Sequence, residues 1–128
     1  LLMKYFRLLK LAGVLLGCLS NGGWVQAHHS FPAQYDINQP HTVEGVVTKV
    51  EWRNPHVYFY MDVYDDQDNV TEWAFELSNI SAMRNQGWSS TTINAGDLLE
   101  VHGSLARDGS TLLNATDIKR SDTGEVLL

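Results

Sequence analysis

His28 and His29 are the residues of this sequence with the clearest chemical potential, because they directly follow Ala27. Val25-Gln26-Ala27 places small or β-branched residues at the −3 and −1 positions of a signal-peptidase cleavage site. Cleavage after Ala27 would make His28 the mature N-terminus. Its free amine, whose pKa is ordinarily about 7.7–8.0, and its imidazole could then chelate a divalent metal together.

Amine and imidazole nitrogens suit Cu(II) best, followed by Ni(II) and Zn(II). An N-terminal histidine that chelates copper is similar to the histidine brace of exported copper proteins, which needs a further imidazole from elsewhere in the fold. The candidates for that imidazole are His29, His56 and His102, with His41 a weaker one. We therefore predict copper, or another divalent metal, as the cofactor. The predicted ligands are His28, His29, His56, Glu76 and His102.

His56 and Glu76 are predicted to lie on the same face of a β-hairpin. Residues 56–64 and 70–77 each alternate apolar and polar side chains, as half-buried strands do, and a short polar link joins them. In the register that this link favours, Tyr58 lies opposite Glu76, which makes His56 a diagonal neighbour of Glu76. The carboxylate could orient the imidazole or share its metal. The alternative is a strand-capping histidine and a solvated glutamate.

The sequence indicates no catalytic arrangement, so enzymatic activity is uncertain and is not what we expect. Ser30 lies beside the two histidines but lacks an orienting acid. Nucleotide-binding glycine motifs are absent from the sequence. Asp65, Asp66 and Asp68 lack the glycine and the terminal glutamate of a calcium loop, which favours a solvated turn.

Residues 1–27 are predicted to be a secretory signal peptide. A short basic segment up to Lys10 precedes an apolar run over residues 11–19, which is too short to cross a bilayer. We therefore expect a periplasmic protein that has no transmembrane segment. In a second interpretation, Leu15-Leu16-Gly17-Cys18 resembles a bacterial lipobox, and Cys18 would carry a lipid anchor. Cleavage after Ala27 would instead remove the only cysteine of the chain.

The charge is distributed unevenly along the 128 residues. The whole chain carries a formal charge of −6, whereas residues 28–128 hold 6 basic and 15 acidic residues and carry −9. Nucleic-acid phosphates require clustered lysine and arginine side chains. The composition therefore argues against a nucleic-acid partner.

The pattern after the signal predicts an extended arm over residues 28–41 and one β-barrel domain over residues 42–128. Five strands and one short helix are expected, in the order β-β-β-α-β-β. This is the order of a five-stranded OB-like barrel, and an SH3-like barrel is the alternative. The expected fold is thus all-β with one short helix. The expected strands cover residues 42–52, 56–64, 70–77, 98–104 and 111–120, and the helix covers 80–86.

Several short motifs recur together in one group of proteins: His28-His29-Ser30-Phe31, Tyr35-Asp36, Gly45, Trp52-x-Asn54-Pro55-His56, Trp73-x-Phe75-Glu76, Gly87-Trp88, Gly96-Asp97 and Arg107-Asp108-Gly109-Ser110. On these motifs the chain resembles a family of small exported bacterial proteins that carry a domain of unknown function. The resemblance implies cleavage after Ala27 and places His28, His29, His56 and Glu76 in the family pattern, but it implies no substrate.

The sequence favours two functions over an enzyme that would use a bound metal as a Lewis acid. The first is an exported, periplasmic binding protein that holds a divalent metal through the mature N-terminal histidine pair and His56. The alternative is a metal-free module of the cell envelope that binds a protein or peptide, using Tyr58, Tyr60 and the arm.

Overall fold

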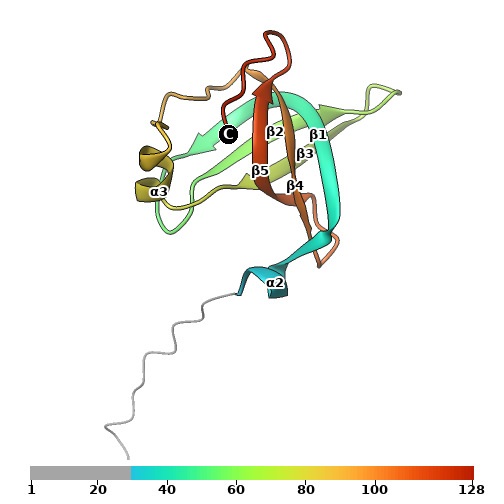
Figure 1. Cartoon of the computed structure of the whole chain (residues 1–128). Coiled ribbons are helices and arrows are strands. Elements are labelled where there is room, and N and C mark those ends of the chain that lie inside the picture. Colours follow the sequence, from blue (N-terminus) through green and yellow to red (C-terminus); the bar gives the residue numbers. More distant parts are fainter. Residues whose placement is uncertain (1–29) are drawn as a thin grey trace, which may run out of the picture.

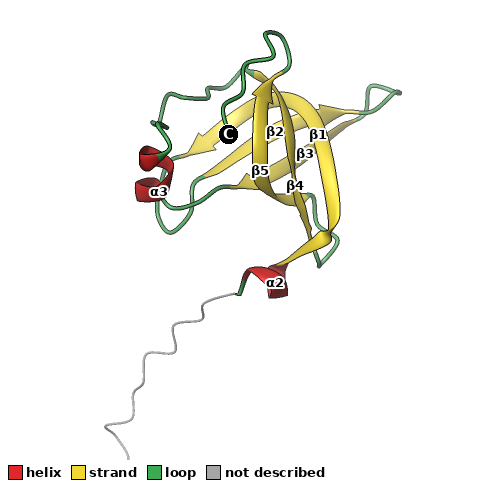
Figure 2. Ribbon diagram, in the orientation of Figure 1, coloured by secondary structure: helices red, strands yellow, loops and turns green. Residues whose placement is uncertain are grey.

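The computed structural model describes residues 30–128, so the predicted signal peptide, His28 and His29 lie outside the described residues. The described residues form a closed barrel with the strand order β1-β2-β3-β5-β4 (Figures 1 and 2). This confirms the predicted five-stranded OB-like barrel. The elements, in chain order, are α2 (Phe31–Gln34), β1 (Tyr35–Glu51), β2 (Tyr58–Tyr64), β3 (Val70–Glu76), α3 (Ile80–Asn85), β4 (Leu98–Ala106) and β5 (Leu112–Arg120).

The long strand β1 closes the barrel on one side because it pairs with β4 and β2 in succession. It can curl at Gly45, where an added Cβ would lie only 2.5 Å from the carbonyl oxygen of Asp62. A register shift between Val47 and Lys49 marks a bulge just beyond this glycine, as expected for a sharply coiled strand. On the other side β3 and β5 pair in parallel, with Glu76 opposite Asn114.

Apolar side chains that alternate along the strands fill the barrel interior. The rings of Phe59 and Phe75 stack there at a centroid distance of 4.8 Å. Trp88, which follows α3, is buried as well, and its indole nitrogen donates a hydrogen bond of 2.8 Å to the carbonyl oxygen of Leu127. The largest buried apolar side chains include Phe59, Met61, Phe75, Met83, Leu99, Leu113 and Ile118.

The helix α3 begins and ends where the sequence indicates. The side chain of Asn79 accepts a hydrogen bond of 2.9 Å from the backbone N–H of Ala82, which caps the first turn. Gly87 follows the helix with a φ of 86°, a left-handed conformation that glycine adopts without strain.

The N-terminal part of the domain differs from the predicted extended arm. The strand β1 begins at Tyr35, and the additional short helix α2 precedes it. Tyr35 pairs with Ala106, and a register shift then separates this pair from the regular ladder that starts at Pro40. Polar residues between the two paired regions interrupt the apolar alternation, so the sequence does not display the early start of the strand.

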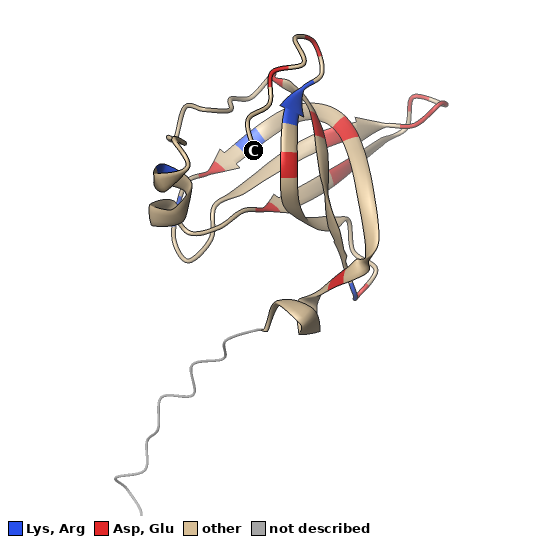
Figure 3. Ribbon diagram, in the orientation of Figure 1, with Lys and Arg blue, Asp and Glu red and all other residues tan. Residues whose placement is uncertain are grey.

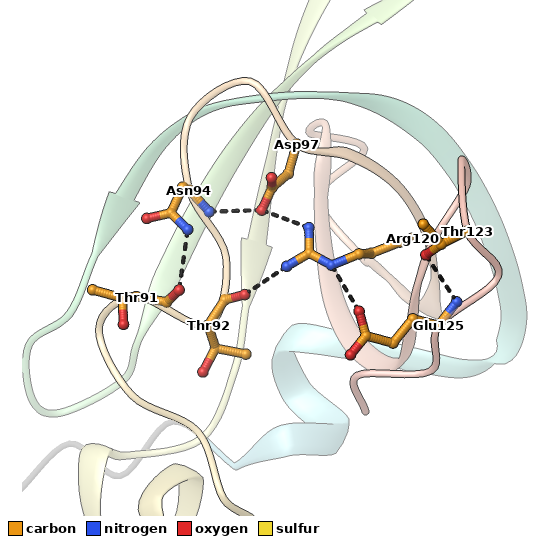
Figure 4. A network of polar contacts seen from close by, with 7 residues as sticks. All are labelled: Thr91, Thr92, Asn94, Asp97, Arg120, Thr123 and Glu125. Carbon is orange, nitrogen blue, oxygen red and sulfur yellow. Dashed lines mark hydrogen bonds and ion pairs between the residues drawn. The ribbon is translucent and has the colours of Figure 1, made fainter.

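One arginine on the outer surface joins three parts of the chain (Figure 4). The guanidinium of Arg120 contacts Asp97 at 2.9 Å and Glu125 at 3.1 Å, and it donates to the carbonyl oxygen of Thr92 at 2.9 Å. These contacts tie the loop before β4 and the C-terminal tail to the end of β5.

Acidic residues occupy the tip of the projecting β2–β3 hairpin and further positions along the barrel strands (Figure 3). Across this hairpin Asp62 is directly opposite Glu72. Among residues 30–128, no helix has the length and apolar character needed to cross a membrane.

Candidate functional site

A buried carboxylate lies at the end of the β-hairpin. Glu76, the last residue of β3, is only 4% exposed. Its Oε1 lies 2.5 Å from Nδ1 of His56, and its Oε2 accepts hydrogen bonds from the hydroxyls of Tyr35 and Tyr58. The distance to the Tyr58 hydroxyl is 2.6 Å. A buried charge is tolerated only when it is paired or hydrogen-bonded, and three partners satisfy this one.

His56 lies in the connection between β1 and β2, directly after a cis peptide bond between Asn54 and Pro55. Its side chain is 48% exposed, in contrast to the buried Glu76. Since Nδ1 contacts Glu76, the other ring nitrogen, Nε2, is left for a further interaction. Within residues 30–128 that nitrogen makes no hydrogen bond or ion pair.

The hydroxyls of Tyr35 and Tyr58 donate to Glu76 and keep their protons at physiological pH. Burial and, after it, the hydrogen bond to Glu76 raise the pKa of Tyr35 far above its ordinary value of 10.0. The same two causes, in the same order, raise the pKa of Tyr58. Both phenols therefore stay protonated at physiological pH, which suits them as donors and makes them poor bases.

These side chains border an open cleft of about 710 Å³. The helix α2 bounds it through Phe31 and Gln34, and β5 contributes Asn114. The cleft therefore brings together the N-terminal segment, the β1–β2 connection and the β3–β5 pairing. Its lining residues are Phe31, Gln34, Tyr35, Pro55, His56, Tyr58, Glu76, Leu77, Ser78, Asn114 and Ala115.

The structure brings together two of the predicted metal ligands, His56 and Glu76. The register is the predicted one, with Tyr58 opposite Glu76. Its position on the outer face suggested that Glu76 would be open to solvent. Instead, Glu76 is buried under Tyr35 and Tyr58. The hydrogen bond from Tyr35 is the reason, because it brings the start of β1 over the carboxylate.

The other predicted ligands lie elsewhere. His102 is on β4, where its Nδ1 lies 2.9 Å from the hydroxyl of Thr42, and it borders a different pocket. His41 stacks on Trp73 at a centroid distance of 5.5 Å. In the part of the chain that the structure describes, no group of three or more His, Cys, Asp or Glu side chains is placed to hold a metal. His28 and His29 lie outside that part.

Tyr35 is the residue of this site that sequence reasoning missed. It is 2% exposed, although it lies in the segment predicted to be an arm. The only signal available was its place in the Tyr35-Asp36 motif, which carries no information about a partner on β3.

A family model described as a family of unknown function (DUF6152) matches residues 16–114. The chain belongs to this family. The match confirms the resemblance to a family with a domain of unknown function. The matched residues include Tyr35, His56, Tyr58 and Glu76, so the whole cluster around the carboxylate lies within the part of the chain that the family model covers.

Comparison with solved structures shows the fold. The mitochondrial single-stranded DNA-binding protein Rim1 from S. cerevisiae superposes with a TM-score of 0.51 at 10% identity, over 65% of this chain and 92% of that chain. The second single-stranded DNA-binding protein (SSBb) from Mycobacterium smegmatis superposes with a TM-score of 0.50 at 19% identity, over 66% of this chain and 90% of that chain. At these identities the likeness supports the OB-type barrel alone. A search of the curated proteins found no match.

Proposed function

We propose that this is an exported, periplasmic protein that binds a divalent metal, copper above all, in the cleft beside Glu76. The observation that carries the proposal is the contact of 2.5 Å between Glu76 and Nδ1 of His56. Metal-binding histidines commonly hold a carboxylate with one ring nitrogen while the other binds the metal. The half-exposed His56 side chain at the cleft meets this requirement.

The further donors in this proposal are the N-terminal amine and imidazole of His28, with His29. Phe31 borders the cleft, and His28 precedes it by three residues. Three residues can span at most about 11 Å, a length over which the proposal has the histidine pair reach the cleft. Cleavage after Ala27 would add the free amine, which makes export and metal binding parts of the same proposal.

Copper titration of the purified protein, processed after Ala27, tests this function. Competition with a chromophoric chelator should give a dissociation constant that rises at least about tenfold in His56→Ala, because a first ligand is lost. Adding one glycine before His28 should weaken binding as well, because it displaces the amine from the histidine. His102→Ala is the matched control and should bind as the unaltered protein does. Equal binding by all four forms would refute the proposal.

The alternative is a metal-free module that binds a protein or peptide of the cell envelope. It is supported by Phe31, an aromatic residue at the mouth of the cleft that is 40% exposed. Tyr60 lies on the outer face of β2, with the Lys49 ammonium 5.2 Å from its ring centroid. If this alternative holds, Tyr60→Ala or Phe31→Ala should abolish capture of an envelope partner, whereas replacing His28 and His29 by alanine should not.

Nucleic-acid binding is not part of the proposal, although the two structural neighbours are single-stranded DNA-binding proteins by name. The pairing of Asp62 with Glu72 puts two carboxylates on the same hairpin face. The charge of −9 on residues 28–128 also repels phosphates. A labelled oligothymidine should show no change in fluorescence anisotropy with this protein at physiological salt.

A further inference from the structure

We infer that Glu76 is a positioning residue for His56 rather than a metal ligand, and that the cleft therefore selects metals that prefer nitrogen donors. This inference rests on the proposed metal binding, but its first test is made on the metal-free protein. It revises the role predicted for Glu76 and names the class of metal that the cleft accepts.

The Glu76 carboxylate already accepts hydrogen bonds at both of its oxygens. A carboxylate has about four lone-pair positions. Two hydroxyl donors, from Tyr35 and Tyr58, occupy Oε2, and the imidazole of His56 occupies Oε1. One position on Oε1 remains, but Glu76 is only 4% exposed, so a metal ion would have to displace these packed partners to reach it. Displacement would leave buried polar groups without partners, at a cost for each of them.

The contact with Glu76 determines which nitrogen of the His56 imidazole carries the proton. A carboxylate accepts hydrogen bonds and has none to donate. Nδ1 of His56 must therefore carry the proton in the contact with Oε1 of Glu76. In the neutral ring this leaves the lone pair on Nε2, which is the nitrogen not held by the carboxylate. The metal-binding tautomer is thus formed before any metal arrives.

The donor atoms left at the cleft determine which class of metal it accepts. With the oxygens of Glu76 engaged, the donor that the described residues offer to a metal at the cleft is the imidazole nitrogen Nε2 of His56. Imidazole and amine donors suit Cu(II), Ni(II) and Zn(II). Calcium and magnesium require several oxygen ligands. The cleft should therefore discriminate strongly against both of these ions.

The substitution Glu76→Gln separates a positioning residue from a ligand. An amide has one accepting oxygen and one donating nitrogen. Since both tyrosine hydroxyls donate to the Oε2 side, the amide oxygen should turn toward them and the NH₂ group toward His56. His56 would then accept through Nδ1 and carry its proton on Nε2, which blocks the metal-binding lone pair.

Nitrogen-15 NMR of the histidine rings in the metal-free protein, at a mildly alkaline pH, reads the tautomer directly. His56 should be protonated at Nδ1 in the unaltered protein and at Nε2 in Glu76→Gln. Two controls should leave the tautomer unchanged. Glu100→Gln alters a carboxylate that pairs with Lys119 and does not line the cleft, and Tyr58→Phe removes only one donor. An Nε2-protonated His56 in the unaltered protein would overturn the inference even if Glu76→Gln failed to fold.

Metal titration provides the second measurement, with Cu(II), Zn(II) and Ca²⁺ alone as probes. Glu76→Gln should lower Cu(II) and Zn(II) affinity about 10–100-fold, as loss of a supporting carboxylate does. Calcium binding that disappears in Glu76→Gln would overturn the inference, because it would make Glu76 a ligand. If the tautomers are as inferred but Cu(II) does not bind, the positioning role stands and the proposed function fails.

Discussion

Tyr35 donates its hydroxyl hydrogen to Oε2 of Glu76, which ties the first residue of β1 to the last residue of β3. The two residues are 41 positions apart in the sequence. Both are nearly inaccessible to solvent. The bond holds the N-terminal segment against the barrel, and it also occupies the carboxylate oxygen that faces away from His56. The start of the domain and the candidate site thus depend on the same hydrogen bond.

Tyr35→Phe should lower the free energy of unfolding by about 1.5–3 kcal/mol, the range measured for hydrogen bonds to charged groups. The substitution keeps the ring and removes only the donor. Urea denaturation followed by tryptophan fluorescence measures the change. Tyr64→Phe is the matched control, because Tyr64 is 56% exposed at the end of β2 and should change stability by less than about 0.5 kcal/mol. Equal effects of the two substitutions would contradict the prediction.

Stability should fall as the pH rises above the ordinary tyrosine value. The pKa of Tyr35 is raised in the folded protein, mainly by burial, so the folded state keeps a proton that the unfolded chain releases above about pH 10. The stabilisation is thus complete below about pH 10 and is lost above it, by at most about 1.4 kcal/mol per pH unit for this group.

Urea denaturation at a series of pH values from 9 to 11 checks this dependence. Tyr35→Phe should show a shallower decline than the unaltered protein, because the group that takes part in the linkage is absent. Parallel curves for the two proteins would show that Tyr35 ionises at the same pH in the folded and unfolded states.

Arg120→Met should loosen the loop before β4 and the C-terminal tail together. Methionine preserves much of the apolar stem but cannot contact Asp97, Glu125 or the carbonyl oxygen of Thr92. We expect a loss of about 1–3 kcal/mol, since several hydrogen bonds to a charged group disappear at once. Amide hydrogen exchange should accelerate in residues 92–97 and 124–128 and not in β2.

Lys119→Met is the control for the arginine substitution. Lys119 forms one ion pair with Glu100, and both side chains are substantially exposed. Exposed pairs of this kind contribute about 0–1 kcal/mol. An effect of Lys119→Met as large as that of Arg120→Met would mean that net charge, and not the network, is responsible.

Gly103→Ala should be strongly destabilising, because an added Cβ would lie 1.9 Å from the carbonyl oxygen of Asn114. That oxygen belongs to the backbone of the neighbouring strand, so the two strands must separate to make room. We expect a loss of at least about 1–3 kcal/mol in urea denaturation. Thr71→Ala, at an exposed position of β3, should stay within about 0.5 kcal/mol of the unaltered protein.

The sequence was sufficient to predict the barrel, because each strand of the β2–β3 hairpin alternates regularly and a short turn fixes its register. Tyr58 was correctly expected opposite Glu76. The burial of Glu76 was not predictable from the same pattern. It depends on Tyr35, whose link to the barrel crosses a polar segment with a register shift. The alternation of apolar and polar residues indicates on which side of a sheet a side chain lies. It does not indicate whether another segment of the chain covers that side.

The same limit applies to the metal ligands predicted from residue type alone. His56 and His102 are both histidines at outward positions, and nothing local to either of them distinguishes their surroundings. Register pairs His102 with Thr42 on β1, whereas the β1–β2 connection carries His56 to the cleft. Their separation follows from the path of the closed barrel, which short sequence patterns do not encode.

The pairing of Glu76 with Asn114 has a consequence for assembly of the domain. It belongs to the parallel contact between β3 and β5, which joins the β1–β3 meander to the β4–β5 hairpin alongside the pairing of β1 with β4. The cleft takes its walls from both units. Neither unit alone contains the whole site. A ligand that contacts both walls would therefore stabilise the association of the two halves of the chain. Binding there should therefore raise the melting temperature of the intact domain, and a chain cut in the loop before β4 should recover the binding when its two pieces reassociate.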